Sequence, residues 1–390
     1  MTEWKTKKVG ELANTQLGKI LNKNKQTGKY SHPYLRSLNV QWGHVELSDL
    51  NHMDILPNEY EKFTLSKGDL LICEGGESGR VAIWNHDVAM GFQNALHRVR
   101  AGGEISNKYL YFYFEWLVKN QLIEHLFNGV TIKHFPQENL RAVEISYPSL
   151  PEQQKIVEIL EDHLSRLDAA LADVKQAKLK AAQFRRSLLQ AAFTGNLTSD
   201  GTRLMTDLPT GWKKVRFGDT FKLRYGKAID KALRKDSARY PVVGSAGIMT
   251  YTDEPLIEEP TIVIGRKGNV GSIQIFEEGC YPIDTTYYMQ STNQFNIKFL
   301  TLLLTSLELM KLDSSTATPS LRREDLENVS FFVPPLTEQQ KIVEILEDHL
   351  SRLDASVAIA DAMEKQSASL RRSLLQAAFT GQLTKEVASV

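Results

Sequence analysis

This 390-residue sequence lacks the features that mark secreted, membrane-spanning or metal-dependent proteins. Its only two cysteines, Cys73 and Cys280, lie far apart, so they offer no disulfide framework and no metal-ligand cluster. There is no basic-then-apolar leader and no apolar run long enough to cross a bilayer. These absences predict a cytoplasmic protein.

Catalytic motifs are also missing. The chain has no Asn-Pro-Pro-aromatic or Asp-Pro-Pro-Tyr motif for base methylation and no Walker-type loop. Four histidines could suggest metal binding or acid–base chemistry, but two of them occupy equivalent places in a repeat, which favours packing or a partner contact. The sequence therefore predicts no catalytic residue, metal or cofactor of its own. The histidines are His125, His134 and the equivalent pair His163 and His349.

What the chain does contain is a long internal repeat. Residues Glu152–Ala169 recur letter for letter as Glu338–Ala355, and Arg185–Gly195 recur as Arg371–Gly381, at one offset of 186 residues. The sequences before the two copies are unrelated. Two equivalent structural elements thus carry two different globular segments, which is the organisation of a two-headed reader.

Each copy is predicted to form one long helix. Between Glu152 and Phe193 there is no glycine or proline, and apolar residues recur at the three–four spacing of a coiled-coil seam. Prolines precede each copy, while Gly195 and Gly381 fit helix ends. The predicted seam residues are Val157, Leu160, Leu164, Leu167, Leu171, Val343, Leu346, Leu350, Leu353 and Val357.

The two seams must be buried, and the simplest partner for each is the other copy. A globular segment precedes each helix, so antiparallel pairing would place the two segments at opposite ends of a rod of roughly 60 Å, related by a pseudo-twofold axis. Parallel pairing would crowd them together. Antiparallel pairing within one chain is our prediction, and the alternative is a helix pair that joins two chains.

The predicted fold class is mixed α/β (α+β), with two globular domains at opposite ends of an antiparallel two-helix coiled coil. Strands are predicted at Leu70–Cys73, Val81–Trp84, Val143–Tyr147, Thr261–Ile264 and Ser272–Phe276. Helices are predicted at Asn107–Phe127 and Ile297–Leu312. The domains are 1–148 (first globular domain), 149–198 (first repeated helix), 199–334 (second globular domain) and 335–390 (second repeated helix).

Charge is unevenly distributed although the formal net charge is zero. Early in each globular segment, cations are interleaved with amides and aromatics, the groups that neutralise phosphates and contact base edges. A solvated charged surface would give a similar pattern in one segment, but its occurrence in both segments favours binding to nucleic acid. The first group contains Lys23, Lys25, Lys29 and Arg36, and the second contains Arg224, Lys227, Lys231 and Lys235.

Each globular segment also carries a glycine-rich turn between two predicted strands, Glu74–Arg80 and Gly265–Gly271. A nucleotide-binding phosphate loop needs a helix next and a Gly-Lys-Ser/Thr ending, and both are absent. Two interpretations remain: tight turns without a ligand, or loops that let Arg80, Arg266 and Lys267 approach DNA.

These features resemble the specificity (S) subunits of type I restriction-modification systems. The similar motifs are the openings Pro148–Val157 and Pro334–Val343 and the Ala-Phe-Thr-Gly endings at 192–195 and 378–381. In the second globular segment 240–247, 264–268 and 281–286 resemble stretches of such domains, and 34–40 in the first does so more loosely. The resemblance covers essentially the whole chain.

The resemblance implies a non-catalytic protein with two target-recognition domains. Each domain would bind one half of a split double-stranded DNA target, with a spacer set by the rod. Partners would be two modification (methyltransferase) subunits and restriction (motor-nuclease) subunits, which carry S-adenosylmethionine, ATP and Mg. A stand-alone two-headed DNA-binding regulator and a protein-bridging scaffold are the alternatives.

The candidate DNA contacts fall into two kinds. Phosphate contacts are predicted for the lysines, and base-edge contacts for arginines and asparagines. Residues duplicated without change at the start of each helix, Glu152–Lys155 and Glu338–Lys341, are of a type usually exposed and are candidates for binding a partner, with recent duplication as the alternative explanation of their identity. The DNA-binding candidates are Lys23, Lys25, Lys29, Arg36, Asn39, Arg80, Arg224, Lys227, Lys231, Lys235, Arg266, Lys267 and Asn269.

Overall fold

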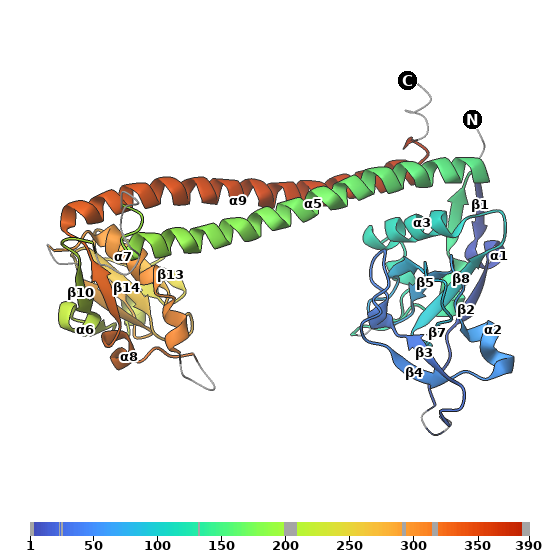
Figure 1. Ribbon diagram of the computed structural model, residues 1–390, viewed down its shortest axis with the longest axis horizontal. Helices are drawn as coiled ribbons and strands as arrows, with labels where there is room; N and C mark the ends of the chain where they lie inside the picture. The colour runs from blue at the N-terminus through green and yellow to red at the C-terminus, as the bar shows by residue number, and fades with distance from the viewer. Residues whose placement is uncertain are drawn as a thin grey trace. The chain divides into compact units, whose positions relative to one another are not determined.

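The computed structural model describes residues 4–22, 24, 26–131, 133–198, 209–290, 294–313 and 319–383. The chain forms two compact units, the first made of Met1–Val174 with Ala362–Val390 and the second of Lys175–Asp361. Each unit contains a mixed α/β head and segments of two long helices (Figure 1). We call residues 4–149 the first head and residues 209–335 the second head.

The main sheet of the first head has four antiparallel strands in the order β2-β8-β5-β6. Strand β5 is buried on both faces, because Leu70 and Ile72 pack toward α3 while Leu71 and Cys73 pack into a second apolar cluster with Phe92. The bounds are β2 Ala13–Leu17, β8 Leu96–Ala101, β5 Leu70–Cys73, β6 Val81–Ile83 and α3 Asn107–Lys119.

Two smaller sheets complete the first head. Strand β3 pairs antiparallel with β4 and parallel with β7, and β1 pairs antiparallel with β9. The strands are β1 Lys5–Lys8, β3 Ser31–Leu35, β4 Asn51–Asp54, β7 Gly91–Phe92 and β9 Glu144–Tyr147. The short helices are α1 Val9–Leu12, α2 Tyr60–Phe63 and α4 Gln137–Ala142, with 3-10 turns η2 Ser37–Asn39, η3 Pro57–Glu59 and η4 Glu124–Leu126.

The second head repeats this topology although its sequence differs. Its sheets have the orders β11-β17-β14-β15, β13-β12-β16 and β10-β18. The strands are β10 Lys213–Arg216, β11 Arg224–Tyr225, β12 Tyr240–Gly244, β13 Gly247–Thr252, β14 Thr261–Gly265, β15 Ile273–Phe276, β16 Tyr281–Pro282, β17 Thr286–Gln290 and β18 Ser330–Val333. The helices are α6 Phe217–Thr220, α7 Ile297–Ser306 and α8 Arg323–Glu327, with 3-10 turns η5 Lys231–Leu233 and η6 Leu309–Leu312.

The two repeated segments form helices α5, Leu150–Phe193, and α9, Leu336–Phe379, which confirms the helix prediction. Both end before a glycine in the left-handed region, Gly195 at φ 75° and Gly381 at φ 72°. Within the described part of the chain, no helix is both long and apolar enough to cross a membrane.

The first seam residues of each long helix are buried both by a helix of the head in the same unit and by the other long helix. In the first unit, Leu160 and Leu164 share a core with Tyr109 of α3 and Leu375 of α9. In the second unit, Leu346 shares a core with residues of α7 and of the end of α5. Val157 and Val343 are buried too, while Leu167, Leu171, Leu350, Leu353 and Val357 are half-buried.

Ion pairs between the helices give their direction within the second unit. Lys178 pairs with Asp361 at 2.6 Å, and Arg185 pairs with Asp354. The residue number on α9 falls as that on α5 rises, so the two helix segments of this unit run antiparallel.

The predicted head helices are too long. Helix α3 ends at Lys119 and α7 ends at Ser306, and each helix is followed by a short 3-10 turn. The cause is local, because Gln121 at φ 60° and Glu308 at φ 47° occupy the left-handed region, which a helix cannot continue through.

Candidate nucleic-acid interface

The predicted cations of the second head begin in the edge strand of its main sheet and continue in the segment that follows this strand. Arg224 belongs to edge strand β11, and Lys227 and Lys231 follow it. All three side chains are exposed, and within the described residues none of the three forms an ion pair. Exposed cations without a carboxylate partner are suited to neutralising phosphates.

The glycine-rich turn of the second head reaches the same edge. The backbone N–H groups of Arg266 and Lys267 both donate to the carbonyl of Thr285, at 2.9 and 3.1 Å. Gly268, at φ 77°, and Gly271, at φ 75°, supply the left-handed conformations that the turn requires. Lys267 and Asn269 are exposed, so the tip of the turn presents one cation and one amide to solvent.

Arg266 is held in place by aromatic rings. Its guanidinium carbon lies 5.2 Å from the ring centre of Tyr225 and 5.7 Å from that of Tyr287, and Nη1 donates to the carbonyl of Asp284 at 2.9 Å. Tyr225 is 48% exposed, whereas Tyr287 is buried. Burial is the main cause that raises the pKa of Tyr287 to about 12, so this ring stays neutral.

Lys235 differs from the other lysines of the second head. Its Nζ lies 2.5 Å from Asp253 Oδ2, and this contact raises the pKa of Lys235 and lowers that of Asp253. A phosphate would have to displace that carboxylate, so Lys235 is a weaker candidate than Lys227 or Lys231.

In the first head, Lys23 and Lys25 lie outside the described residues. Lys29 is exposed, with Nζ 5.4 Å from the ring centre of Tyr30. Asp54 fixes this loop by accepting from the backbone N–H of Thr27 at 2.5 Å and of Gly28 at 2.9 Å, and hydrogen bonds led by the Thr27 hydroxyl lower its pKa.

Two other candidates of the first head are committed to internal contacts. Arg36 pairs with Asp49 at 2.7 Å. Asn39 is fully buried, accepts from the Arg36 backbone N–H and donates to the carbonyls of Glu46 and Asp49. The prediction that Asn39 contacts a base edge therefore conflicts with its position, because its amide is used in shaping the loop.

Arg80 is likewise only 9% exposed. Its guanidinium donates to the Ser37 carbonyl at 2.7 Å and to Glu77 at 3.0 Å. This side chain ties the glycine-rich turn of the first head to the segment that follows β3, and its charge is compensated. A direct base contact would require the Ser37 and Glu77 contacts, and a longer one to Gln41 at 3.4 Å, to be displaced.

Two glutamines that the sequence suggested to be exposed are buried. Gln153 is 0% exposed and Gln339, its equivalent in the repeat, is 1% exposed. Gln153 donates to the carbonyls of Glu104 and Pro148 and accepts from the backbone N–H of Ser106, at 2.9 to 3.0 Å. We call this set the first joint, because it ties the start of α5 to the N-cap of α3.

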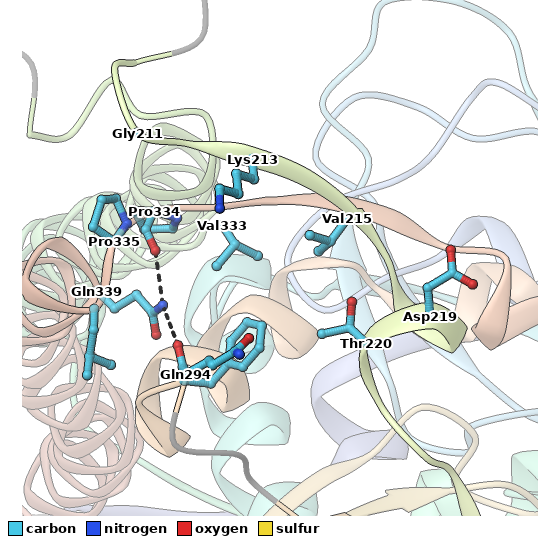
Figure 2. A pocket seen from close by; sticks show the side chains of 12 residues that line it. Gly211, Lys213, Val215, Asp219, Thr220, Gln294, Val333, Pro334, Pro335 and Gln339 are labelled. Atoms are coloured by element: carbon cyan, nitrogen blue, oxygen red, sulfur yellow. Dashed lines mark hydrogen bonds between the residues drawn. The ribbon is translucent and has the colours of Figure 1, made fainter.

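The second joint has the same design around Gln339. Its carboxamide donates to the carbonyls of Pro334 and Gln294, as Figure 2 shows, and accepts from the backbone N–H of Asn296, the N-cap of α7. The interpretation of these glutamines as partner-binding residues is therefore wrong. Their identity in both copies has a structural cause, and the only sequence signal for it was the exact repetition.

An open pocket of about 670 Å³ lies beside the second joint (Figure 2). Lys213, Asp219 and Thr220 contribute polar groups to it, together with Gln339 and apolar residues of β10 and β18. Its lining includes no predicted DNA-contacting residue. The concave feature and the candidate interface of the second head are thus made of different residues.

In the described part of the chain, no group of three or more histidine, cysteine, aspartate or glutamate side chains is arranged to hold a metal ion. Burial raises the pKa of Cys73 to about 11 and that of Cys280 to about 12, so both thiols stay protonated. His349 contacts the ring of Phe184 at 6.5 Å, which is a packing contact.

A family model described as the type I restriction modification DNA specificity domain matches residues 1–180 and 209–361, well over half of the chain. Among curated relatives, the specificity subunit of the type I restriction enzyme StySPI of Salmonella potsdam is 24% identical over 91% of this chain and 83% of that protein. The MjaIX specificity subunit of Methanocaldococcus jannaschii is 25% identical over 53% of this chain. The chain spans about half of that relative, 48% of its length.

Solved structures show the same fold. A chain from a structure concerned with complex assembly and conformational transition of the type I R-M system aligns with a TM-score of 0.76 at 18% identity, over 98% of this chain and 99% of that one. The HsdS subunit from Thermoanaerobacter tengcongensis aligns with a TM-score of 0.57 at 19% identity, over 97% of both chains.

Proposed function

The chain belongs to the type I restriction modification DNA specificity family, and we propose that it is the DNA-reading subunit of a type I restriction-modification enzyme. Each head reads one half of a bipartite double-stranded target. The subunit supplies sequence specificity and no catalysis. Base methylation, ATP use and DNA cleavage belong to partner subunits that carry S-adenosylmethionine, ATP and Mg.

The observation that carries this proposal is the equivalence of the contacts that seat the two heads on the repeated helices. Lys108 of the first head pairs with Glu161 at 2.7 Å, and Lys298 of the second pairs with Glu347 at 2.8 Å. The ring of Tyr109 packs against that of Phe379, and the ring of Phe299 packs against that of Phe193. In both pairs the ring centres are 5.4 Å apart. In both joints, the glutamine side chain donates to the carbonyl of a proline that lies just before the long helix. One chain therefore presents two differently surfaced heads on equivalent supports.

We further propose that α5 and α9 form an antiparallel coiled-coil rod with pseudo-twofold symmetry and the heads at opposite ends. The recognition domains are then 1–148 and 199–334, and the helical segments are 149–198 and 335–390. A rod of fixed length sets the spacer between half-sites, in phase with a helical turn of about 10 to 10.5 base pairs. The repeated helix surfaces seat two copies of a methyltransferase subunit.

Contacts to DNA divide by residue type. The exposed lysines Lys227 and Lys231 give salt-dependent affinity that is blind to sequence, while Arg224 contacts a base edge. Base reading in the second head falls to the glycine-rich turn with Arg266 and Asn269. In the first head Lys29 and the glycine-rich turn take these roles, while Arg36 and Arg80 shape the surface.

A selection from random duplexes tests the proposal. The purified chain, alone and with its methyltransferase subunit, is incubated with the pool at two salt concentrations, and the bound duplexes are sequenced. We expect a split motif that emerges with the methyltransferase present. Full specificity from the chain alone would favour a stand-alone regulator, and salt-independent recovery of unselected DNA would favour a bridging protein.

A further inference from the structure

Glu74 of the first head and Arg266 of the second occupy the same place in the fold. The backbone N–H of Glu74 donates to the carbonyl of Ala95, and its carbonyl accepts from Phe135. The N–H of Arg266 donates to Thr285, and its carbonyl accepts from Leu321. Each residue directly follows an inner strand of its main sheet, β5 or β14, and opens the glycine-rich turn.

The turns themselves close in the same way. Gly79 donates to the carbonyl of Cys73 at 2.9 Å, and Gly271 donates to that of Gly265 at 2.8 Å. Both glycines have positive φ, 84° and 75°. The heads therefore hold a carboxylate and a guanidinium at one structural position, with opposite charge.

Both side chains are partly exposed and oriented by a neighbour. Arg266 lies against the Tyr225 and Tyr287 rings and uses one of its five N–H donors on the Asp284 carbonyl. Both carboxylate oxygens of Glu74 lie 3.2 Å from His134 Nδ1, and the Glu74 side chain is 21% exposed. One ring nitrogen occupies only part of a carboxylate's capacity to accept hydrogen bonds. A held side chain loses less conformational entropy on binding than a free one.

We propose that this position reads one base in each half-site, with guanine as the ligand of Arg266 and the amino group of cytosine as the ligand of Glu74. Arginine donates to O6 and N7 of guanine, whereas glutamate accepts from N4 of cytosine. This inference rests on the proposed function. It adds the bases that two structurally equivalent residues recognise and assigns a role to Glu74, which lay outside the sequence-based candidates.

The selection from random duplexes, repeated with Arg266→Gln and Glu74→Gln in complex with the methyltransferase subunit, tests the inference. Glutamine pairs with adenine through N6 and N7. We expect Arg266→Gln to lower the preference for guanine at one position by about 5- to 150-fold and to shift it toward adenine. Glu74→Gln should likewise lower the preference for cytosine at one position of the other half-site and shift it toward adenine. Lys267→Gln, in the same turn as Arg266, should weaken all sequences alike.

Wild-type motifs retained by both variants, or changes confined to one half-site, would overturn the inference while leaving the proposed function intact.

If a variant binds no duplex, the inference is tested instead by modifying bases of the DNA and measuring their binding to the unmodified complex. Replacing each guanine in turn by 7-deazaguanine removes N7, and each cytosine by 2-pyrimidinone removes the amino group. Binding must fall at least about 5-fold at one guanine of one half-site and at one cytosine of the other, and insensitivity at all positions refutes the assignment. Failure of the unmodified complex to select any motif refutes the proposed function instead.

Discussion

Arg371 of α9 donates from Nη1 to Oδ1 of Asp168 on α5 at 2.9 Å. The residues that correspond to them through the repeat, Arg185 and Asp354, form the same pair in the second unit. Each copy of the repeat thus supplies the arginine of one pair and the aspartate of the other. Within the described residues, Arg371 alone of the two arginines has an additional ionic partner, the fully buried Glu115 of α3, which Nε contacts at 2.9 Å.

That difference makes the two arginines a matched pair for mutation. Arg371→Ala leaves Glu115 buried with Lys119 as its remaining ionic partner, and we expect a loss of about 1.5 to 3 kcal/mol in the free energy of unfolding. Arg185→Ala removes an ion pair that is largely exposed and should cost less than about 1 kcal/mol. Calorimetric unfolding of both variants checks the contrast, and equal losses would contradict it.

The buried carboxylate also predicts a pH dependence. Burial alone would raise the pKa of Glu115, but Lys119 and Arg371 outweigh it and lower the pKa below its ordinary value of 4.5. Because the folded state binds this proton less readily than the unfolded state, the contribution to stability is present above 4.5 and lost as pH falls through the folded-state pKa. The melting temperature of Glu115→Gln should therefore fall less steeply than that of the unmodified protein from about pH 5 to about pH 3. Parallel curves would show that the group contributes nothing.

The buried glutamine of the second joint should be sensitive to substitution. Gln339→Leu leaves the carbonyls of Pro334 and Gln294 and the N–H of Asn296 without this partner, with an expected cost of about 2 to 4 kcal/mol. The neighbouring Gln340 is exposed, and Gln340→Leu should change stability by less than about 0.5 kcal/mol. Chemical denaturation followed by tryptophan fluorescence compares the two. A weakened joint should also widen the range of spacer lengths that the complex accepts.

Phosphate contacts can be counted from the salt dependence of binding. Lys227→Gln should reduce the slope of log K against log salt concentration by roughly 0.9. Lys235→Gln should change it less, because Asp253 already neutralises that side chain. Fluorescence anisotropy with a duplex carrying the selected motif gives both slopes. An unchanged slope for Lys227→Gln would remove this residue from the interface.

The length of the repeated helices should set the spacer. Val174 and Ala360 are equivalent buried positions, and a heptad inserted after each lengthens both helices by about 10.5 Å, or about three base pairs. We expect the preferred spacer to lengthen accordingly in the duplex selection. Insertion into one helix alone breaks the register of the ion pairs and should abolish selection of a split motif. An unchanged spacer with both insertions would refute the rod as a ruler.

Much of this fold could be predicted from the sequence, because its strongest signals are local or exactly repeated. The three–four apolar spacing and flanking glycines predict α5 and α9, and the apolar run Leu70–Cys73 coincides with β5. The breaks after α3 and α7 were missed, because non-glycine residues, Gln121 and Glu308, adopt positive φ there.

The candidate interface was less predictable, because the partner of each polar residue is distant in sequence. Asn39 has an amide of the kind that reads bases, but this amide donates to the carbonyls of Glu46 and Asp49 within a loop. Gln153 is of a residue type that is usually exposed, but its side chain hydrogen-bonds to the backbone of Glu104 and Ser106, which are distant in sequence. Composition cannot separate an exposed cation such as Lys227 from one compensated by a distant carboxylate.

We propose that this chain directs a partner methyltransferase to a split DNA sequence. Single-molecule methylome sequencing tests it most directly, in a host without its own DNA methyltransferases that expresses this chain with its methyltransferase subunit, beside controls that express each alone. We expect a bipartite motif with a fixed spacer, methylated only when both are present. No new methylation, with the two proteins folded and co-purifying, would contradict it.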